Sequence, residues 1–360
     1  MIAKQCLSAE WVRQEQARMP QASAETIEKA IRALALLERL AASGLRFIFK
    51  GGTCMMLHLQ ELRRLSVDVD IVCMESRDKI ETALGLVAAE EPFLSWEPDP
   101  RNPDRRPRRK HYKLHYRSLN PDNREPFVLL DVVIEHTPYP FTEKKPVQAQ
   151  FIQSANPPLV TVPTINGLLG DKLTAFAPNT VGVRYKPALS QQIIKQMFDV
   201  GELFLVGTNI DQIAKTHTAL FAAENGFRNG KYTLEGALND TLETAFRISQ
   251  LNLRNEEKWD NSKRGMLLAG ITAINATLIQ ARYTVDDARV SASRVALTAA
   301  LILAGRTGKL ARFRHDPDNE AALPATLPGR FAVFNILRQT APEVFYNWNQ
   351  VQNLIPTPFF

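Results

Sequence analysis

The sequence predicts an α+β protein, with a mixed sheet and helices in residues 1–160 and a helical region in residues 161–360. In the first of these regions, short apolar runs lie between turn signals, a pattern typical of strands. Prolines between 157 and 163 separate it from a second region with helical periodicity and few strand signals. At 360 residues the chain can bury two cores, so we expect two domains divided near residue 160.

The N-terminal region is expected to begin with an amphipathic helix at 24–43, because apolar residues recur there at helical spacing. Ser23 can cap its start and Gly44 can end it. A strand, a glycine turn and a second helix are expected at 45–62, and a further strand at 67–72.

Prolines at positions 98, 100, 103 and 107 are expected to break regular structure and to mark a long basic loop. Alternation of polar and apolar residues predicts a half-exposed strand at 111–117, and the apolar run at 127–134 predicts a central strand. In the C-terminal region, helical periodicity marks the stretches 165–177, 189–206, 234–251, 263–282 and 286–304.

Composition excludes several classes of protein. No apolar run approaches the roughly 20 residues that span a bilayer, and the polar N-terminus lacks the apolar core of a signal peptide. Cys6, Cys54 and Cys73 show no C-x-x-C spacing, which argues against a disulfide framework or a zinc site. We therefore expect a cytoplasmic protein without a membrane partner. The net charge of +6 favours a polyanionic partner.

Two acids, Asp68 and Asp70, alternate with apolar residues in the strand expected at 67–72. Alternation places both carboxylates on one face of the strand, about 7 Å apart. Such a pair either faces solvent or binds a cation, and Mg²⁺ with phosphate oxygens suits it, because Mg²⁺ takes one or two carboxylates and leaves positions for substrate.

Two further features favour the metal interpretation. Gly51-Gly52-Thr53 lies between a strand and a helix, where backbone N–H groups favour phosphate, although an ordinary tight turn has the same pattern. Asp131 interrupts the central apolar strand, and a buried carboxylate is costly unless it is paired or binds an ion. Together these features predict a site with two Mg²⁺ ions for in-line attack on an α-phosphate.

The order of apolar strand, Gly-Gly-Thr, helix and Arg64-Leu65-Ser66-x-Asp68-x-Asp70-Ile71 resembles the DNA polymerase β-like nucleotidyltransferase superfamily. Within it, the chain resembles most closely the AbiEii/AbiGii toxins of bacterial toxin–antitoxin systems. The resemblance covers about residues 45–205. It implies a polymerase β-like nucleotidyltransferase domain and a helical C-terminal domain that completes the nucleotide cleft. It also implies Gly51, Gly52, Thr53 and Ser66 as nucleotide-binding residues, and a cognate antitoxin.

The resemblance also covers 170–176 and 195–200. Lys172 lies in an otherwise apolar segment, so its ammonium can reach along that surface toward a triphosphate, although most helix-face lysines are simply solvated. Asp199 matches a family aspartate and is expected to orient Lys172 or to help bind nucleotide. Lys195 replaces the family's arginine as a nucleotide-binding residue, and Gln196 replaces its first aspartate, which puts a role for that position in doubt.

Basic residues cluster between 101 and 117, where eight positive side chains stand against one acid. We expect this segment to follow the phosphates of an acceptor nucleic acid. The candidate nucleic-acid-binding residues are Arg105, Arg106, Arg108 and Arg109. His111 and His115 share one strand face and are expected to add to the basic surface.

The predicted function is Mg²⁺-dependent transfer of NMP from an NTP to an acceptor, most simply tRNA or another RNA, by Asp68, Asp70, Asp131, Lys172 and Asp199 as catalytic residues. Two alternatives stay open. One is transfer to a small molecule, as in antibiotic nucleotidyltransferases. The other is a non-catalytic protein that binds nucleotide or antitoxin.

Overall fold

The structure is a computed structural model that describes residues 1–100, 109–123 and 125–355. It forms two compact units. Unit 1 comprises Met1–Pro138, Thr142–Thr164 and Ala276–Arg282, and unit 2 comprises Tyr139–Phe141, Ile165–Asn275 and the chain from Tyr283 onward. Compactness of a unit does not establish that it folds independently, so the domains 1–160 and 161–360 stay predictions. In the described ranges, none of the helices combines the length and apolarity that crossing a membrane requires.

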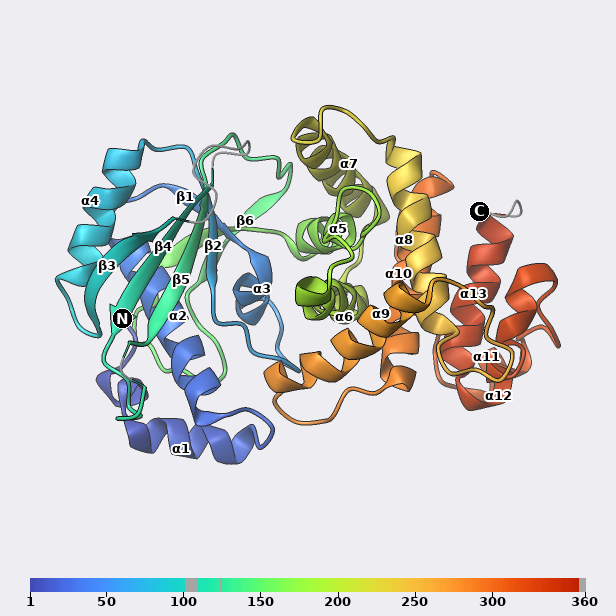
Figure 1. Cartoon of the computed structure of the whole chain (residues 1–360), viewed down its shortest axis with the longest axis horizontal. Coiled ribbons are helices and arrows are strands. Elements are labelled where there is room, and N and C mark those ends of the chain that lie inside the picture. The colour runs from blue at the N-terminus through green and yellow to red at the C-terminus, as the bar shows by residue number, and fades with distance from the viewer. Residues whose placement is uncertain (101–108, 124, 356–360) are drawn as a thin grey trace. The chain divides into compact units, whose positions relative to one another are not determined.

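Unit 1 is built on a mixed seven-stranded sheet of order β3-β4-β5-β2-β1-β7-β6 (Figure 1). β2 lies at its centre, antiparallel to β1 and parallel to β5. The strands are β1 (Phe47–Lys50), β2 (Val69–Cys73), β3 (Phe93–Asp99), β4 (Arg109–Tyr116), β5 (Phe127–Val133), β6 (Thr142–Pro146) and β7 (Leu159–Pro163). The chain is therefore an α+β protein, as predicted.

Alternation gives the central strands one covered face. Val128, Leu130 and Val132 on β5 are buried, whereas the residues between them are half-buried. Helix α2 (Ala24–Ala42) packs against β2 and β5, and α4 (Arg77–Ala88) packs against β3 (Figure 1). The remaining helices of unit 1 are α1 (Ala9–Arg18) and α3 (Gly51–Cys54), with 3-10 turns at Lys4–Leu7 and Met55–Leu57.

The bounds of α2 agree with the helix expected at 24–43. The Ser23 hydroxyl accepts a hydrogen bond from the Thr26 N–H, as a capping side chain does. Gly44 follows the helix with φ +79°, a backbone conformation that glycine adopts without a Cβ penalty.

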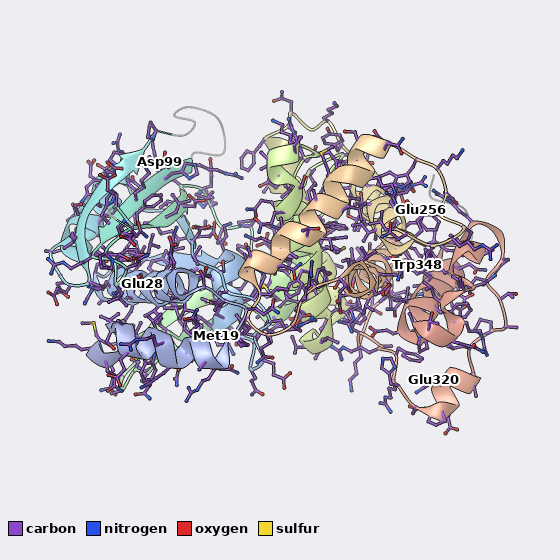
Figure 2. All side chains as sticks on the ribbon, turned by 60° about the horizontal axis from the view of Figure 1, so that its bottom comes forward. Met19, Glu28, Asp99, Glu256, Glu320 and Trp348 are labelled. Atoms are coloured by element: carbon purple, nitrogen blue, oxygen red, sulfur yellow. The ribbon has the colours of Figure 1, made fainter. Side chains whose placement is uncertain are left out.

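Unit 2 is helical in its described part. Its helices are α5 (Ile165–Ala175), α6 (Ser190–Val206), α7 (Ile210–Gly226), α8 (Leu234–Ser249), α9 (Asn261–Ala273), α10 (Val285–Leu303), α11 (Pro317–Ala321), α12 (Leu337–Thr340) and α13 (Pro342–Leu354). Short 3-10 turns lie at Pro187–Leu189 and Gly329–Phe334, and another, Ile274–Thr277, begins in unit 2 and ends in unit 1. Helix α10 packs against α6, α8 and α13, and Trp348, labelled in Figure 2, is fully buried on α13.

Two helices end earlier than predicted. The helix expected through Leu62 is a single α-helical turn, α3, followed by a 3-10 turn, and in the stretch 263–282 the α-helix ends at Ala273. These two segments meet in unit 1, where the Leu65 N–H donates to the Thr277 carbonyl at 2.9 Å and the Ile279 N–H donates to the Arg63 carbonyl at 3.1 Å. The Thr277 carbonyl and the Ile279 N–H are engaged in this long-range pairing, so they are not available to a continuation of α9.

Pro98 was expected to break regular structure, yet it lies inside β3. That expectation was wrong because β3 is an edge strand of the sheet. Proline lacks an N–H, and a strand edge does not require one.

Candidate active site

Two of the predicted carboxylates lie side by side on neighbouring strands. Asp70 on β2 and Asp131 on β5 are register partners in a parallel pair, so their side chains project from the same face. Adjacent strands are about 4.8 Å apart. This register brings together two acids that are 61 residues apart in the sequence.

The pair belongs to a row of ionisable residues that crosses five strands. Successive register partners are Asp99 on β3, His111 on β4, Asp131 on β5, Asp70 on β2 and Lys50 on β1. Asp99, labelled in Figure 2, lies at the end of β3. The two acids in the middle of the row are thus neighbours, and residues that can carry positive charge lie on either side of them.

Asp68 lies outside the strand in which it was expected. β2 begins at Val69, so Asp68 belongs to the segment that leads into it. The Thr53 hydroxyl donates a hydrogen bond to the Asp68 carbonyl, and Thr53 is fully buried. Thr53 therefore uses its side chain to fix the backbone before β2; its predicted contact with nucleotide stays a prediction.

The glycine turn lies directly against Asp70. Gly51 has φ +81°, and a Cβ at this position would overlap the Asp70 carboxylate. A Cβ on Gly52 would lie 2.8 Å from both Arg64 Nη2 and Ser66 Oγ. Only glycine lets the backbone approach these side chains so closely. Because α3 is only one turn long, it lacks the dipole of a long helix. The groups of this turn that are available to a phosphate are its backbone N–H groups.

These residues fit a bound Mg²⁺ ion through two carboxylates. Among the described residues, no three His, Cys, Asp or Glu side chains converge as a complete metal site. Mg²⁺ does not require one, because water and substrate phosphates complete its coordination around one or two carboxylates. Asp70 and Asp131 are placed as such a pair, and Asp68, Asp70 and Asp131 as metal ligands stay predictions.

His111 is a residue of the site that the sequence did not reveal. Its Nδ1 lies 2.5 Å from Asp131 Oδ1, and the two side chains are 15% and 32% exposed. Sequence alternation placed His111 on a strand face but could not show which strand lies beside it. The antiparallel register of β4 and β5 supplies the missing information.

Unit 2 holds the other predicted catalytic pair. Lys172 on α5 and Asp199 on α6 form an ion pair with Nζ and Oδ2 2.9 Å apart, and both side chains are buried. Lys172 is therefore not a solvated surface lysine. Lys195 and Gln196 lie on α6 within four residues before Asp199, and both are half-buried.

Most of the predicted nucleic-acid-binding residues lie outside the described residues. These are Arg105, Arg106 and Arg108. Arg109 is exposed at the start of β4. The described part of the basic segment therefore enters the sheet two residues before the row at His111.

Residues 35–288 match the family described as nucleotidyl transferase AbiEii toxin of a type IV toxin–antitoxin system. The chain belongs to the AbiEii family. The match includes the carboxylate row, the glycine turn and the Lys172–Asp199 pair. As a member, the chain is a nucleotidyltransferase of the toxin class, and an antitoxin and an NTP substrate follow from that membership.

Solved structures were compared with the chain for similarity of fold. MenT4, a nucleotidyltransferase toxin from Mycobacterium tuberculosis, is similar with a TM-score of 0.53 and 13% identity, over 95% of this chain and 97% of that one. JHP933 from Helicobacter pylori matches with a TM-score of 0.43 and 15% identity, over 77% of this chain and 92% of its own. No curated protein matches the chain in sequence.

Proposed function

We propose that this AbiEii-family toxin transfers NMP from an NTP to an acceptor RNA such as tRNA in the cytoplasm, with Mg²⁺ bound by Asp70, Asp131 and Asp68. The observation that carries this proposal is the register of Asp70 with Asp131 beside the backbone of Gly51 and Gly52. Like charges directly opposite each other are destabilising in a sheet, so a functional cation explains their placement.

In the proposed reaction, an acceptor hydroxyl oxygen attacks the α-phosphorus of the NTP and the bond to pyrophosphate breaks. Mg²⁺ ions, two in the proposed arrangement, supply Lewis acidity and neutralise phosphate charge when bound. Asp70 and Asp131 would bind and orient them, with the Gly51 backbone close to Asp70 and the Gly52 backbone close to Ser66. Lys172 and Lys195 are proposed to bind nucleotide phosphates, with Asp199 holding the Lys172 ammonium.

RNA as acceptor is favoured by the basic residues from 101 to 117, which include the exposed Arg109. Lys and Arg side chains bind nucleic acid by displacing counterions from its phosphates. A small-molecule acceptor has no need of such a segment, so the RNA acceptor is the better explanation of its charge.

The test incubates the protein with each α-labelled NTP and total RNA, with Mg²⁺ or with EDTA. We expect Mg²⁺-dependent label in RNA, lost in Asp70→Asn and kept in Glu97→Gln. Glu97 is the matched control because it is an acid of the same sheet that lies outside the row. Label confined to small molecules would disprove the RNA acceptor. NTP binding without transfer to any acceptor would disprove the proposed catalysis.

A further inference from the structure

Asp131 has an acid as its neighbour on one side in the sheet and a histidine as its neighbour on the other. On β2 its register partner is the acid Asp70, and on β4 its register partner is His111. The two carboxylates repel each other, and that repulsion favours rotation of the Asp131 side chain away from Asp70. His111 lies on that opposite side, and its Nδ1, 2.5 Å from Asp131 Oδ1, gives the carboxylate one defined position there.

The partner's chemistry gives the direction of this hydrogen bond. An ionised carboxylate only accepts, so His111 Nδ1 carries the hydrogen and donates it to Oδ1. The His111 side chain is 15% exposed and so is held by its surroundings, whereas the Asp131 side chain is 32% exposed. The histidine thus fixes one oxygen of a carboxylate that remains accessible.

We propose that His111 is a positioning residue that holds Asp131 in the orientation in which it binds the metal ion. The proposal rests on the function proposed above, because it requires Asp131 to be a metal ligand. Groups that hydrogen-bond to metal ligands typically contribute about 10- to 100-fold to metal affinity. His111 is therefore expected to act on metal binding itself, before nucleotide or RNA arrives.

His115 provides a matched control on the same strand face. It lies on β4 away from the row, where its Nε2 is 3.4 Å from Glu97 Oε1 and its side chain is 23% exposed. It is a comparable histidine of β4 with an acidic neighbour, but that neighbour is not a proposed metal ligand.

The experiment measures binding of Mn²⁺ by electron paramagnetic resonance in the absence of NTP and RNA. Asparagine at position 111 places its amide nitrogen the same number of bonds from Cβ as Nδ1, whereas the amide nitrogen of glutamine corresponds to Nε2. We expect His111→Gln to weaken Mn²⁺ binding about tenfold or more. His111→Asn should recover most of that affinity, and His115→Gln should bind as the wild type does.

Asp131→Asn, measured in parallel, separates this inference from the proposed function. If Asp131→Asn loses Mn²⁺ binding while His111→Gln binds like the wild type, the positioning role is wrong and the metal site stands. If Asp131→Asn binds Mn²⁺ normally, both the metal site and the role of His111 are wrong. Far-ultraviolet circular dichroism of each variant identifies loss of fold. When His111→Asn and His111→Gln are both folded, the difference between their Mn²⁺ affinities tests the positioning role.

Discussion

In unit 1 two like charges, Asp70 and Asp131, lie in register on neighbouring strands, whereas in unit 2 the acid Asp199 lies 2.9 Å from the ammonium of Lys172. The first pair is half-buried, and the second pair is buried. Removing one member of a buried ion pair leaves the other charge uncompensated, which costs about 3–5 kcal/mol. Replacing one of two neighbouring half-buried carboxylates relieves repulsion, which offsets the loss of contacts such as that of Asp131 with His111.

Because of this difference, we expect mutations at the first pair to change the rate of transfer, and mutations at the second pair to change the free energy of unfolding. The carboxylate row should control catalysis with little effect on stability. The Lys172–Asp199 pair should control the stability of unit 2 as well as any contribution to nucleotide binding.

The largest effect is expected for Asp70→Asn. Loss of a metal ligand removes several kcal/mol of transition-state stabilisation, and about 4 kcal/mol corresponds to roughly a thousandfold in rate. Transfer rate and urea unfolding should be measured on the same preparation, and the free energy of unfolding should change by less than about 1 kcal/mol. Asp68→Asn and Asp131→Asn should behave alike. If a variant keeps more than about a tenth of the wild-type rate, its activation free energy has risen by less than roughly 1.4 kcal/mol. Such a result would contradict the assignment of that acid as a metal ligand.

The second effect concerns stability. Lys172→Met should lower the free energy of unfolding by about 3–5 kcal/mol because the buried Asp199 carboxylate loses the Lys172 ammonium. Lys172→Met combined with Asp199→Leu should recover much of that stability. Lys195→Met is the matched control on α6, since Lys195 is only half-buried. Equal unfolding midpoints for Lys172→Met and Lys195→Met would show that the buried pair is not a structural element.

The third effect depends on pH and should be shared by both units. Burial is the main cause that lowers the pKa of His58 in unit 1 and of His217 in unit 2 from 6.5 to about 4. The unfolded chain therefore binds protons at a higher pH than the folded chain, so stability should fall as pH drops from about 6.5 to about 4. Each histidine should contribute on the order of 3 kcal/mol to this decrease.

The free energy of unfolding in urea should be compared at about pH 7 and about pH 4.5, because most of the expected decrease falls between these values. His217→Asn should be less sensitive to acid than the wild type, while the exposed His315, changed to Asn, is the control. An unchanged pH slope in His217→Asn would contradict a buried neutral imidazole. The same experiment on His58→Asn shows whether the two units share this property.

The smallest effect concerns the basic segment before β4. Neutralising Arg105, Arg106, Arg108 and Arg109 together should weaken RNA binding and flatten its salt dependence, by roughly 0.7 in slope for each phosphate of a single strand that the variant no longer binds. Transfer at saturating RNA should change little, because these side chains position the acceptor. RNA affinity across a salt series checks this expectation, and superimposable curves for wild type and variant would exclude the segment as the RNA-binding surface.

Local signals in the sequence predicted much of this molecule. Ser23 and Gly44 define α2 because a capping hydroxyl and a left-handed glycine act within a few residues. The mixed sheet and the helical region followed from periodicity. Asp70 and Asp131 could be singled out because each interrupts an apolar strand.

Features that depend on distant parts of the chain were not predictable in this way. The role of His111 depends on which strand lies beside β4, and alternation within one strand carries no such information. The end of α9 at Ala273 accompanies the pairing of Thr277 and Ile279 with Leu65 and Arg63, which are distant in the sequence. The burial of Lys172 depends on the helix that supplies Asp199.

The return of residues 276–282 to unit 1 has a consequence for synthesis of this toxin. The ribosome makes all of the sheet before residue 165, but the backbone partners of Arg63 and Leu65 are added only with Thr277 and Ile279. A nascent or prematurely terminated chain that ends before Ala276 therefore lacks part of unit 1 next to the segment that carries Ser66 and Asp68. Completion of the unit that holds the carboxylate row is thereby delayed until most of the polypeptide has been translated.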